Sequence, residues 1–467
     1  MNNLPVSLKP TNQSMLWATK ECGTANFGDT RLTHRLVSLV ASLIEHPEKS
    51  LPEALGQWSD VKAAYRFFDN EKVTVEAIYD AHRKATIEKI KNQPVVLAIQ
   101  DTTIFNYTLH REIKGLGPIG QAGLSGFFLH SCLAASAEGV PLGILAHRLW
   151  VRSLEPKEKT HKKRPIEDKE SVRWIDVTRE VAETVSPFTK VVMVGDRESD
   201  IFDLFLLASA NQYDILVRAA WNCRIDQSHD YLWPVVESAP ALGRTVINIP
   251  RADKRPERKA VVLTLQAATV TLKPPKHRGK EKLAAPTLNA LLVHEQSPPE
   301  GEKPIEWMLL TTLPVTTIDD ALQYLTWDTY RWRIERYHYI LKSGCQVEKL
   351  QLETKDRLMR AIAVYSMVAS QLLWLTYQAR QTPDAPCTIV LSNSEWGALY
   401  AAIHKITILP DNPPNLQTAV LWIAKLGGFL GRKRDGYPGL KVLWRGFRRL
   451  QDLTTMWDLF HPSDTCG

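Results

Sequence analysis

The chain has 467 residues, of which 44% are hydrophobic and 23% are charged. This length allows two or three domains, and the composition excludes fibrous and intrinsically disordered classes. The formal net charge of +7 favours a polyanionic partner without requiring one.

The N-terminal part of the chain is predicted to be a small helical module, residues 1–72. Between residues 30 and 46 the apolar side chains recur at helical spacing, with Asp29 or Thr30 as the cap and Pro47 as the stop. Arg31 and Arg35 lie four residues apart on this helix, where both could reach a DNA phosphate. Further helices are expected at about 61–68 and 75–90.

The pattern changes to strands at Pro94. Apolar runs at 94–101, 127–136 and 141–151 predict three strands, and a helix (168–185), a strand (190–196), a helix from near Ser199 and a strand (214–220) follow. This order is the plan of an RNase H-like α/β domain, although many α/β folds begin in a similar way. We place this domain at residues 73–380.

Residues from about 221 to 312 form a β-rich block that we interpret as an insertion into this domain. Residues 381–467 are predicted to be helical, with proline-rich breaks at 382–386 and 409–414. Their apolar faces are available for packing or self-association, which predicts a helical C-terminal dimerisation domain. These faces contain Trp422, Leu426, Phe429, Trp444, Phe447, Leu450 and Trp457.

Basic residues gather in five runs, at 157–164, 251–259, 273–282, 432–434 and 445–449. Any one run is typical of a solvated loop, but five in one chain favour nucleic acid as the partner. The six cysteines are scattered without a C-x-x-C pair, which argues against structural zinc and disulfides. The N-terminus lacks a signal-peptide plan and no apolar run approaches the roughly 18 residues of a membrane span. We therefore expect a reduced, cytoplasmic protein.

One predicted helix, residues 330–342, carries a glutamate between two cations. At roughly 100° per residue, Arg331, Glu335 and Lys342 fall within about 40° of one another on one face. Such a face suits an enzyme that holds a divalent metal through the glutamate and grips a nucleic-acid phosphate with the two cations. A solvated helix with an Arg–Glu pair is the alternative interpretation.

Two aspartates follow predicted strands. Asp101 ends the run VVLAIQD and Asp196 ends VVMVGD. An aspartate at a strand end is often a turn or helix cap. Together with Glu335, however, the pair would form an oxygen-only site suited to Mg²⁺ or Mn²⁺, with room for two ions about 3.5 to 4 Å apart.

The chain resembles the bacterial DDE transposases of insertion-sequence family four, the group that includes cut-and-paste transposases of the transposon-five type. The matching stretches are AIQDTT around Asp101, GDRESDIF around Asp196, and RWRIERYH through LKSG around Glu335. Outside these motifs, FGDTRLTHRLVSL and AAYRFFDN resemble the family's end-binding module, EWMLLTTLPV its β-insertion, and LGGFLGRKRDG its C-terminal region. The similarity covers nearly the whole chain.

The resemblance implies that Asp101, Asp196 and Glu335 are the metal-binding catalytic triad. It also implies that Arg331 and Lys342 belong to the family's Y-(2)-R-(3)-E-(6)-K signature. The tyrosine of that signature is replaced here by Asp328. This aspartate could weaken phosphate binding or add an acid near the metals.

Two more residues take DNA-binding roles from the resemblance. Trp307 matches the position where an indole stacks on a base flipped out of the duplex, although a buried tryptophan in a strand is the alternative. Arg218 matches a DNA-contacting arginine.

The resulting hypothesis is a transposase that binds the terminal inverted repeats of its own element, pairs two ends as a homodimer and inserts them into target DNA. Cleavage would need Mg²⁺, with Mn²⁺ as a substitute and two ions per site. The resemblance implies nicking, hairpin formation, hairpin hydrolysis and strand transfer. An RNase H-like structure-specific nuclease and a non-catalytic DNA-binding or inhibitory relative remain as alternatives.

Overall fold

A ten-stranded mixed sheet lies at the centre of the fold, with helices on both faces. The computed structural model describes residues 10–120, 123–153, 164–185, 187–211, 213–226, 231–249, 258–278, 281–432 and 435–461. It confirms a mixed α/β protein with helical N-terminal and C-terminal regions. The basic runs at 157–164, 251–259, 273–282 and 432–434 lie wholly or partly outside the described residues.

Among the described residues, four helices form the N-terminal module and α5 follows it, and the helices predicted from periodicity are confirmed. The helix that starts at Thr30 is capped by Asp29, whose side chain accepts a hydrogen bond from the backbone N–H of Arg31. Apolar side chains from these helices pack inward, and the Phe27 and Phe67 rings meet edge to face. The helices are α1 (Asn12–Cys22), α2 (Thr30–Glu45), α3 (Leu51–Leu55), α4 (Trp58–Asp69) and α5 (Val75–Ile90).

The strands follow the order β2-β3-β1-β5-β6-β10-β9-β8-β7, and β4 pairs with β3. Strand β1 is antiparallel to β3 and parallel to β5, which is parallel to β6. The β-rich block continues this sheet, because β10 pairs with β6. The strands are β1 (Val95–Asn106), β2 (Gly117–Pro118), β3 (Ser125–Ser136), β4 (Pro141–Trp150), β5 (Lys190–Gly195), β6 (Asp214–Arg218), β7 (Ala241–Ile249), β8 (Arg258–Thr271), β9 (Thr287–Glu295) and β10 (Glu306–Thr311).

Alternate residues of the strands enter two different cores. In β1, Leu97 and Ile99 join the core that contains α9 (Ile318–Tyr330), α10 (Trp332–Tyr339) and α11 (Lys355–Gln381). Val96 and Ala98 join the opposite core with α6 (Val172–Thr184), α7 (Phe202–Asn211) and α8 (Leu232–Glu237). Residues with an odd number in β1 therefore face α9 to α11.

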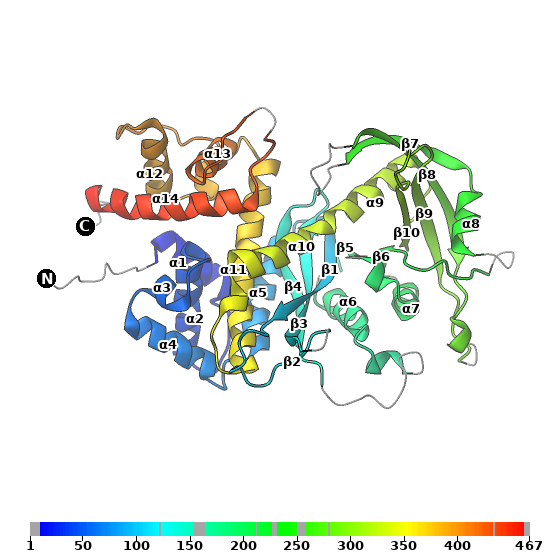
Figure 1. Ribbon diagram of the computed structural model, residues 1–467, viewed down its shortest axis with the longest axis horizontal. Helices are drawn as coiled ribbons and strands as arrows, with labels where there is room; N and C mark the ends of the chain where they lie inside the picture. Colours follow the sequence, from blue (N-terminus) through cyan, green and yellow to red (C-terminus); the bar gives the residue numbers. More distant parts are fainter. Residues whose placement is uncertain are drawn as a thin grey trace.

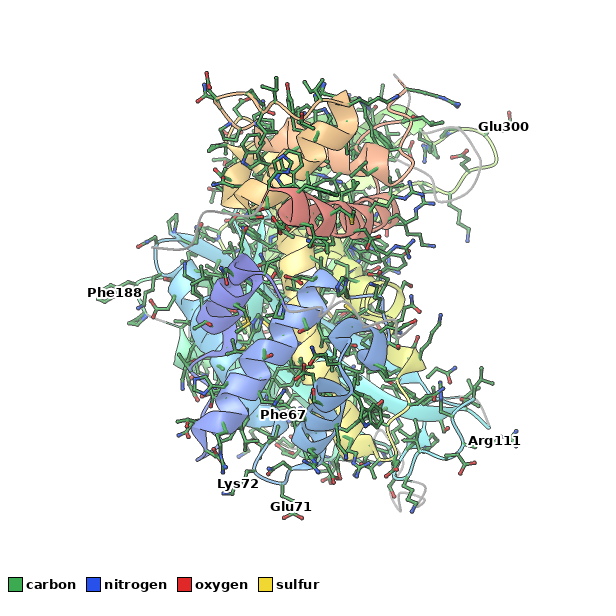
Figure 2. The ribbon with its side chains drawn as sticks, turned by 90° about the vertical axis from the view of Figure 1, so that its left-hand side faces the viewer. Phe67, Glu71, Lys72, Arg111, Phe188 and Glu300 are labelled. Carbon is green, nitrogen blue, oxygen red and sulfur yellow. The ribbon has the colours of Figure 1, made fainter. Side chains whose placement is uncertain are left out.

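The C-terminal helices form a third core. They are α12 (Asn393–His404), α13 (Leu416–Leu426) and α14 (Leu440–Phe460). The apolar faces predicted from the sequence pack against one another here, with Leu450 fully buried and Trp422, Phe447 and Trp457 partly buried. Figure 1 shows α11 running between the sheet on one side and the N-terminal and C-terminal helices on the other. In Figure 2 the C-terminal helices lie above the N-terminal module, in which Phe67 is labelled.

Helix α11 corrects one expectation from the sequence. Its most apolar window of 18 residues has a mean hydropathy of 1.4, so by length and composition it could cross a membrane. However, 72% of that window is buried inside the protein. It contacts α2, α5 and β4. The apolar side chains of this helix therefore pack in the core of the protein.

Candidate active site

Asp101 and Asp196 lie beside each other on neighbouring parallel strands. The sequence predicted that strand β1 ends at Asp101. In the structure β1 continues to Asn106, because β3 pairs with it over nearly its whole length. Strand β5 does end directly before Asp196. The last register pair is Ile99 with Val194, so extending it by two residues brings Asp101 level with Asp196. Both positions alternate with residues of the core under α9 to α11, and therefore both face those helices.

The backbone after Asp196 fixes this carboxylate. The residues Arg197–Ser199 form a single 3₁₀ turn, and the Asp196 side chain accepts a hydrogen bond of 2.8 Å from the backbone N–H of Glu198. One of its oxygens thus caps the turn, as expected for an aspartate after a strand.

Glu335 reaches the same place from a helix that is interrupted twice, which corrects the predicted continuous α-helix. Helix α9 ends at Tyr330, and α10 begins after a tight turn in which the Arg331 N–H bonds to the Asp328 carbonyl. After Tyr339 the backbone forms a π-helix, Ile340–Gly344, a feature often found at functional sites. Arg331 donates a hydrogen bond of 3.0 Å to Glu335, whose side chain is 37% exposed.

The three acidic residues share one electrostatic environment. Burial raises the pKa of Asp101, and the negative charges of Asp196 and Glu335 raise it further. These effects outweigh the opposing hydrogen bond from Thr102 and the charge of Arg331, so the pKa of Asp101 rises from 3.8 to about 7. The charges of Asp196 and Glu335 therefore both act on the Asp101 carboxylate.

The donor set fits a hard divalent cation, because all three side chains offer carboxylate oxygens that repel one another. Among the residues that the structure describes, however, no group of three or more His, Cys, Asp or Glu side chains is already spaced to hold a metal ion. Glu335 is engaged by Arg331. By their chemistry the three carboxylates would suit Mg²⁺ or Mn²⁺, whereas their spacing in the structure is not that of a metal site.

His338 lies next to Asp101 and was missed in the sequence. Its Nδ1 is 3.7 Å from an Asp101 oxygen, and its Nε2 is 3.3 Å from the Ser131 hydroxyl on β3. Burial and the charge of Lys342 lower its pKa to about 3, so its ring is neutral. Its place one turn after Glu335 on the same helix is the only signal the sequence offered.

Arg173 of α6 was also missed, and it joins the two aspartate segments from the other face of the sheet. Its Nε donates to the Thr102 hydroxyl at 2.9 Å, and its Nη2 donates to Glu198 at 2.8 Å. Thr102 follows Asp101 directly, and Glu198 is the residue whose N–H bonds to Asp196. No sequence motif around Arg173 predicts these contacts, because they join segments that are distant in the sequence.

The two predicted phosphate-binding residues of this segment, Arg331 and Lys342, occupy different settings. Arg331 is buried beside Glu335, with its guanidinium 5.1 Å from the centre of the Trp332 ring. Lys342 lies in the π-helix, 5.7 Å from the centre of the Phe105 ring. Phe105 is four residues beyond Asp101 on the same face of β1, which is about 13 Å along the strand.

Arg218, Trp307 and Asp328 form a cluster beside the triad. Extending the β5–β6 register by one pair from Gly195 and Val217 brings Arg218 level with Asp196. Arg218 makes an ion pair with Asp328, and its guanidinium lies 5.4 Å from the centre of the Trp307 ring. Asp328, the residue that departs from the family signature, is thus paired with Arg218 and is not exposed to solvent.

Arg31 and Arg35 lie far along the chain from these groups, on α2. Arg31 is 90% exposed and pairs with Asp29 at 2.8 Å, and Arg35 pairs with Asp60 at 3.3 Å. Exposed pairs of this kind are weak, so they leave both arginines able to change partner. The structure does not bring them to the carboxylate site.

Two family models match the chain, one near each end. A model described as transposase DNA-binding matches residues 14–73. A model described as transposase Tn5 dimerisation domain matches residues 367–456. The first covers the N-terminal helices, and the second covers the end of α11 and α12 to α14.

Proposed function

We propose that this chain, which its two family matches identify as a Tn5-like transposase, cuts and joins DNA through the carboxylates of Asp101, Asp196 and Glu335. The matches confirm the predicted resemblance and support DNA binding and self-association. The observation that carries the catalytic part is the strand register that brings Asp101 level with Asp196 on neighbouring parallel strands. The charges of Asp196 and Glu335, which contribute to the raised pKa of Asp101, support it.

The strand order supports an RNase H-like catalytic domain as part of this proposal. Strands β4, β3 and β1 are antiparallel neighbours, and β5 and β6 add to β1 in parallel. In such a domain one carboxylate sits on the central strand and a second follows its parallel neighbour, which is the arrangement of Asp101 and Asp196. We retain the boundaries 73–380 for this domain, with the β-rich block at about 221–312 as its insertion.

Asp101, Asp196 and Glu335 would hold Mg²⁺, with Mn²⁺ as a substitute, and we propose two ions per site. When bound, such ions supply charge stabilisation for an in-line displacement at phosphorus. The chain's own residues hold the DNA: Arg331 and Lys342 bind phosphate, and Trp307 stacks on a displaced base. The proposed reaction order is nicking, hairpin formation, hairpin hydrolysis and strand transfer.

The proposed substrates are the inverted repeats of the chain's own element and a target DNA. The N-terminal module, with Arg31 and Arg35, would bind the repeats, and the C-terminal helices would pair two copies of the chain. We place this activity in the bacterial cytoplasm, where such an element would lie on a chromosome or plasmid.

The test replaces each carboxylate by its amide: Asp101→Asn, Asp196→Asn and Glu335→Gln. Each variant should bind an inverted-repeat duplex as tightly as the unmodified protein but cut it slower by a factor of about 100 or more, because positioning and charge stabilisation are lost together. Gel-shift and cleavage assays in Mg²⁺ measure both. Asp319→Asn, an exposed acid at the start of α9, is the matched control and should cut normally.

A variant of the three that still nicks at the normal rate would contradict the triad. Cutting of branched DNA without inverted repeats by the unmodified protein would instead favour a structure-specific nuclease. The match to a transposase DNA-binding family argues against that alternative, and the gathering of all three acids argues against a non-catalytic relative.

A further inference from the structure

Asp328 and Arg218 form a buried ion pair at the position where the family signature has tyrosine. The Arg218 Nη2 donates to an Asp328 oxygen, and the two side chains are 16% and 2% exposed. A carboxylate buried this deeply requires a cation in direct contact. The two side chains therefore behave as one unit without net charge.

The Arg218 guanidinium, which pairs with Asp328, also lies near the ring of Trp307. Leu309 of β10 is the register partner of Arg218, and Trp307 lies two residues from Leu309 on the same strand face. Arg218 and Trp307 are thus diagonal neighbours, with 5.4 Å between the guanidinium carbon and the ring centre. Among the described residues the Arg218 side chain makes no other hydrogen bond, and its Nε is buried without a hydrogen-bond partner.

We propose that Asp328, by pairing with Arg218, makes this arginine part of a base-binding platform shared with Trp307 and not a phosphate-binding residue. The proposal rests on the proposed function, because it names the DNA group that this corner of the site receives. Phosphate binding draws on net positive charge and releases counterions. A guanidinium whose charge is cancelled by a carboxylate offers little net positive charge to a phosphate and releases few counterions. It can still donate N–H groups to an uncharged base that stacks on the indole.

Arg331 provides a comparison within the same site. It also pairs with a carboxylate, Glu335, at 3.0 Å, but Glu335 is 37% exposed and can exchange its partner for another cation. Asp328 is 2% exposed and has Arg218 as its ion-pair partner. The Arg331 side chain is itself only 8% exposed, so its charge becomes available to a phosphate through the exchange of Glu335, whereas Arg218 stays paired with Asp328 and takes the base.

The salt dependence of DNA binding separates these roles. The measurement is the affinity for an inverted-repeat duplex over a range of salt concentrations. Asp328→Asn keeps the shape of the side chain but frees the charge of Arg218. The slope of log affinity against log salt should then steepen by about 0.9, which is about 3.5-fold more affinity lost between about 50 and about 200 mM salt. An unchanged slope would overturn the proposal.

The double variant Arg218→Gln/Asp328→Asn gives an independent answer and leaves no buried charge that could disturb folding. If the pair contributes no phosphate contact, its slope equals that of the unmodified protein. If Arg218 binds phosphate, the slope becomes shallower by about 0.9, and the proposal is wrong. Asp319→Asn, on the same helix but exposed, controls for the loss of one negative charge and should leave the slope unchanged.

The base-binding part is tested with 2-aminopurine at the end of the same duplex. The double variant and Trp307→Ala should each lose most of the fluorescence change that the unmodified protein produces. A full fluorescence change in both would overturn this part. If the unmodified protein neither prefers the inverted repeat to a scrambled duplex nor cuts it, the proposed function fails. If it does both while the variants behave normally, only this inference fails.

Discussion

At the scale of single residues, Glu21 is a buried acid whose charge helps to hold α1 of the N-terminal module against α5. It lies on α1 and contacts two residues of α5, with His82 at 2.5 Å and Lys89 at 2.8 Å. Burial by itself raises the pKa of Glu21, but His82 and Lys89 outweigh burial and lower it from 4.5 to about 2. The ionised form is therefore stabilised by folding.

Glu21→Gln should lower the free energy of unfolding by roughly 3 kcal/mol near neutral pH. Because the folded pKa lies below the unfolded one, this contribution is present above pH 4.5 and is lost as the pH falls toward 2. Urea unfolding of both proteins at neutral and acidic pH measures it. Glu88→Gln on α5, where Glu88 is an exposed partner of Lys91, should change stability little. A difference between Glu21→Gln and the unmodified protein that persists at acidic pH would contradict the charge argument.

At the scale of elements, α6 joins β1 to the turn after β5 through one side chain. Arg173 donates to Thr102, to Glu198 and to the Glu170 carbonyl, so all three guanidinium nitrogens are engaged. Thr102 and Glu198 adjoin the two aspartates. Arg173 is thus a positioning residue for the distance between Asp101 and Asp196.

Arg173→Gln should weaken Mn²⁺ binding by about tenfold or more, the usual effect of losing a group that orients metal ligands. Calorimetric titration with Mn²⁺ in the absence of DNA measures this without relying on cleavage. Arg179→Gln is the matched control, since Arg179 lies on the same helix and makes an exposed pair with Asp176. Normal Mn²⁺ affinity in Arg173→Gln would show that the aspartates keep their spacing without it.

Elements with a strong local signal could be predicted from the sequence. The helix that starts after Asp29 and the strand that ends before Asp196 carry their own periodicity and caps. The end of β1 could not be predicted, because pairing with β3 carries that strand past Asp101. The turn at Arg331 and the π-helix after Tyr339 were also missed, since both are departures from the regular spacing that the prediction assumed.

The candidate site divides in the same way. Asp101, Asp196 and Glu335 could be predicted because they stand in motifs. Arg173 and the Asp328–Arg218 pair could not, because their partners are far away in the sequence and only the fold brings them together.

At the scale of the whole molecule, the C-terminal helices, which belong to the part of the chain that matches a dimerisation family, contact the π-helix that follows α10. Gly344, at the end of the π-helix, lies against the Trp444 ring of α14 so closely that a Cβ would come within 2.4 Å of it. In turn, α13 and α14 are in backbone contact, since a Cβ on Gly446 would lie 1.8 Å from the Ile423 carbonyl oxygen (Figure 1).

Gly446→Ala tests this packing. In an exposed helix such a change stabilises by about 1 kcal/mol, but here the added methyl group must push α13 and α14 apart, which costs about 1 to 3 kcal/mol or more. We therefore expect lower thermal stability and fewer complexes that pair two DNA ends, with normal binding of a single end by the N-terminal module. Thermal unfolding and native gels measure these quantities.

Gly439→Ser adds a side chain where no atom lies within 4 Å and keeps a good helix cap, so it should behave normally. Equal amounts of the paired complex in the two variants would mean that pairing does not depend on the contact between α13 and α14.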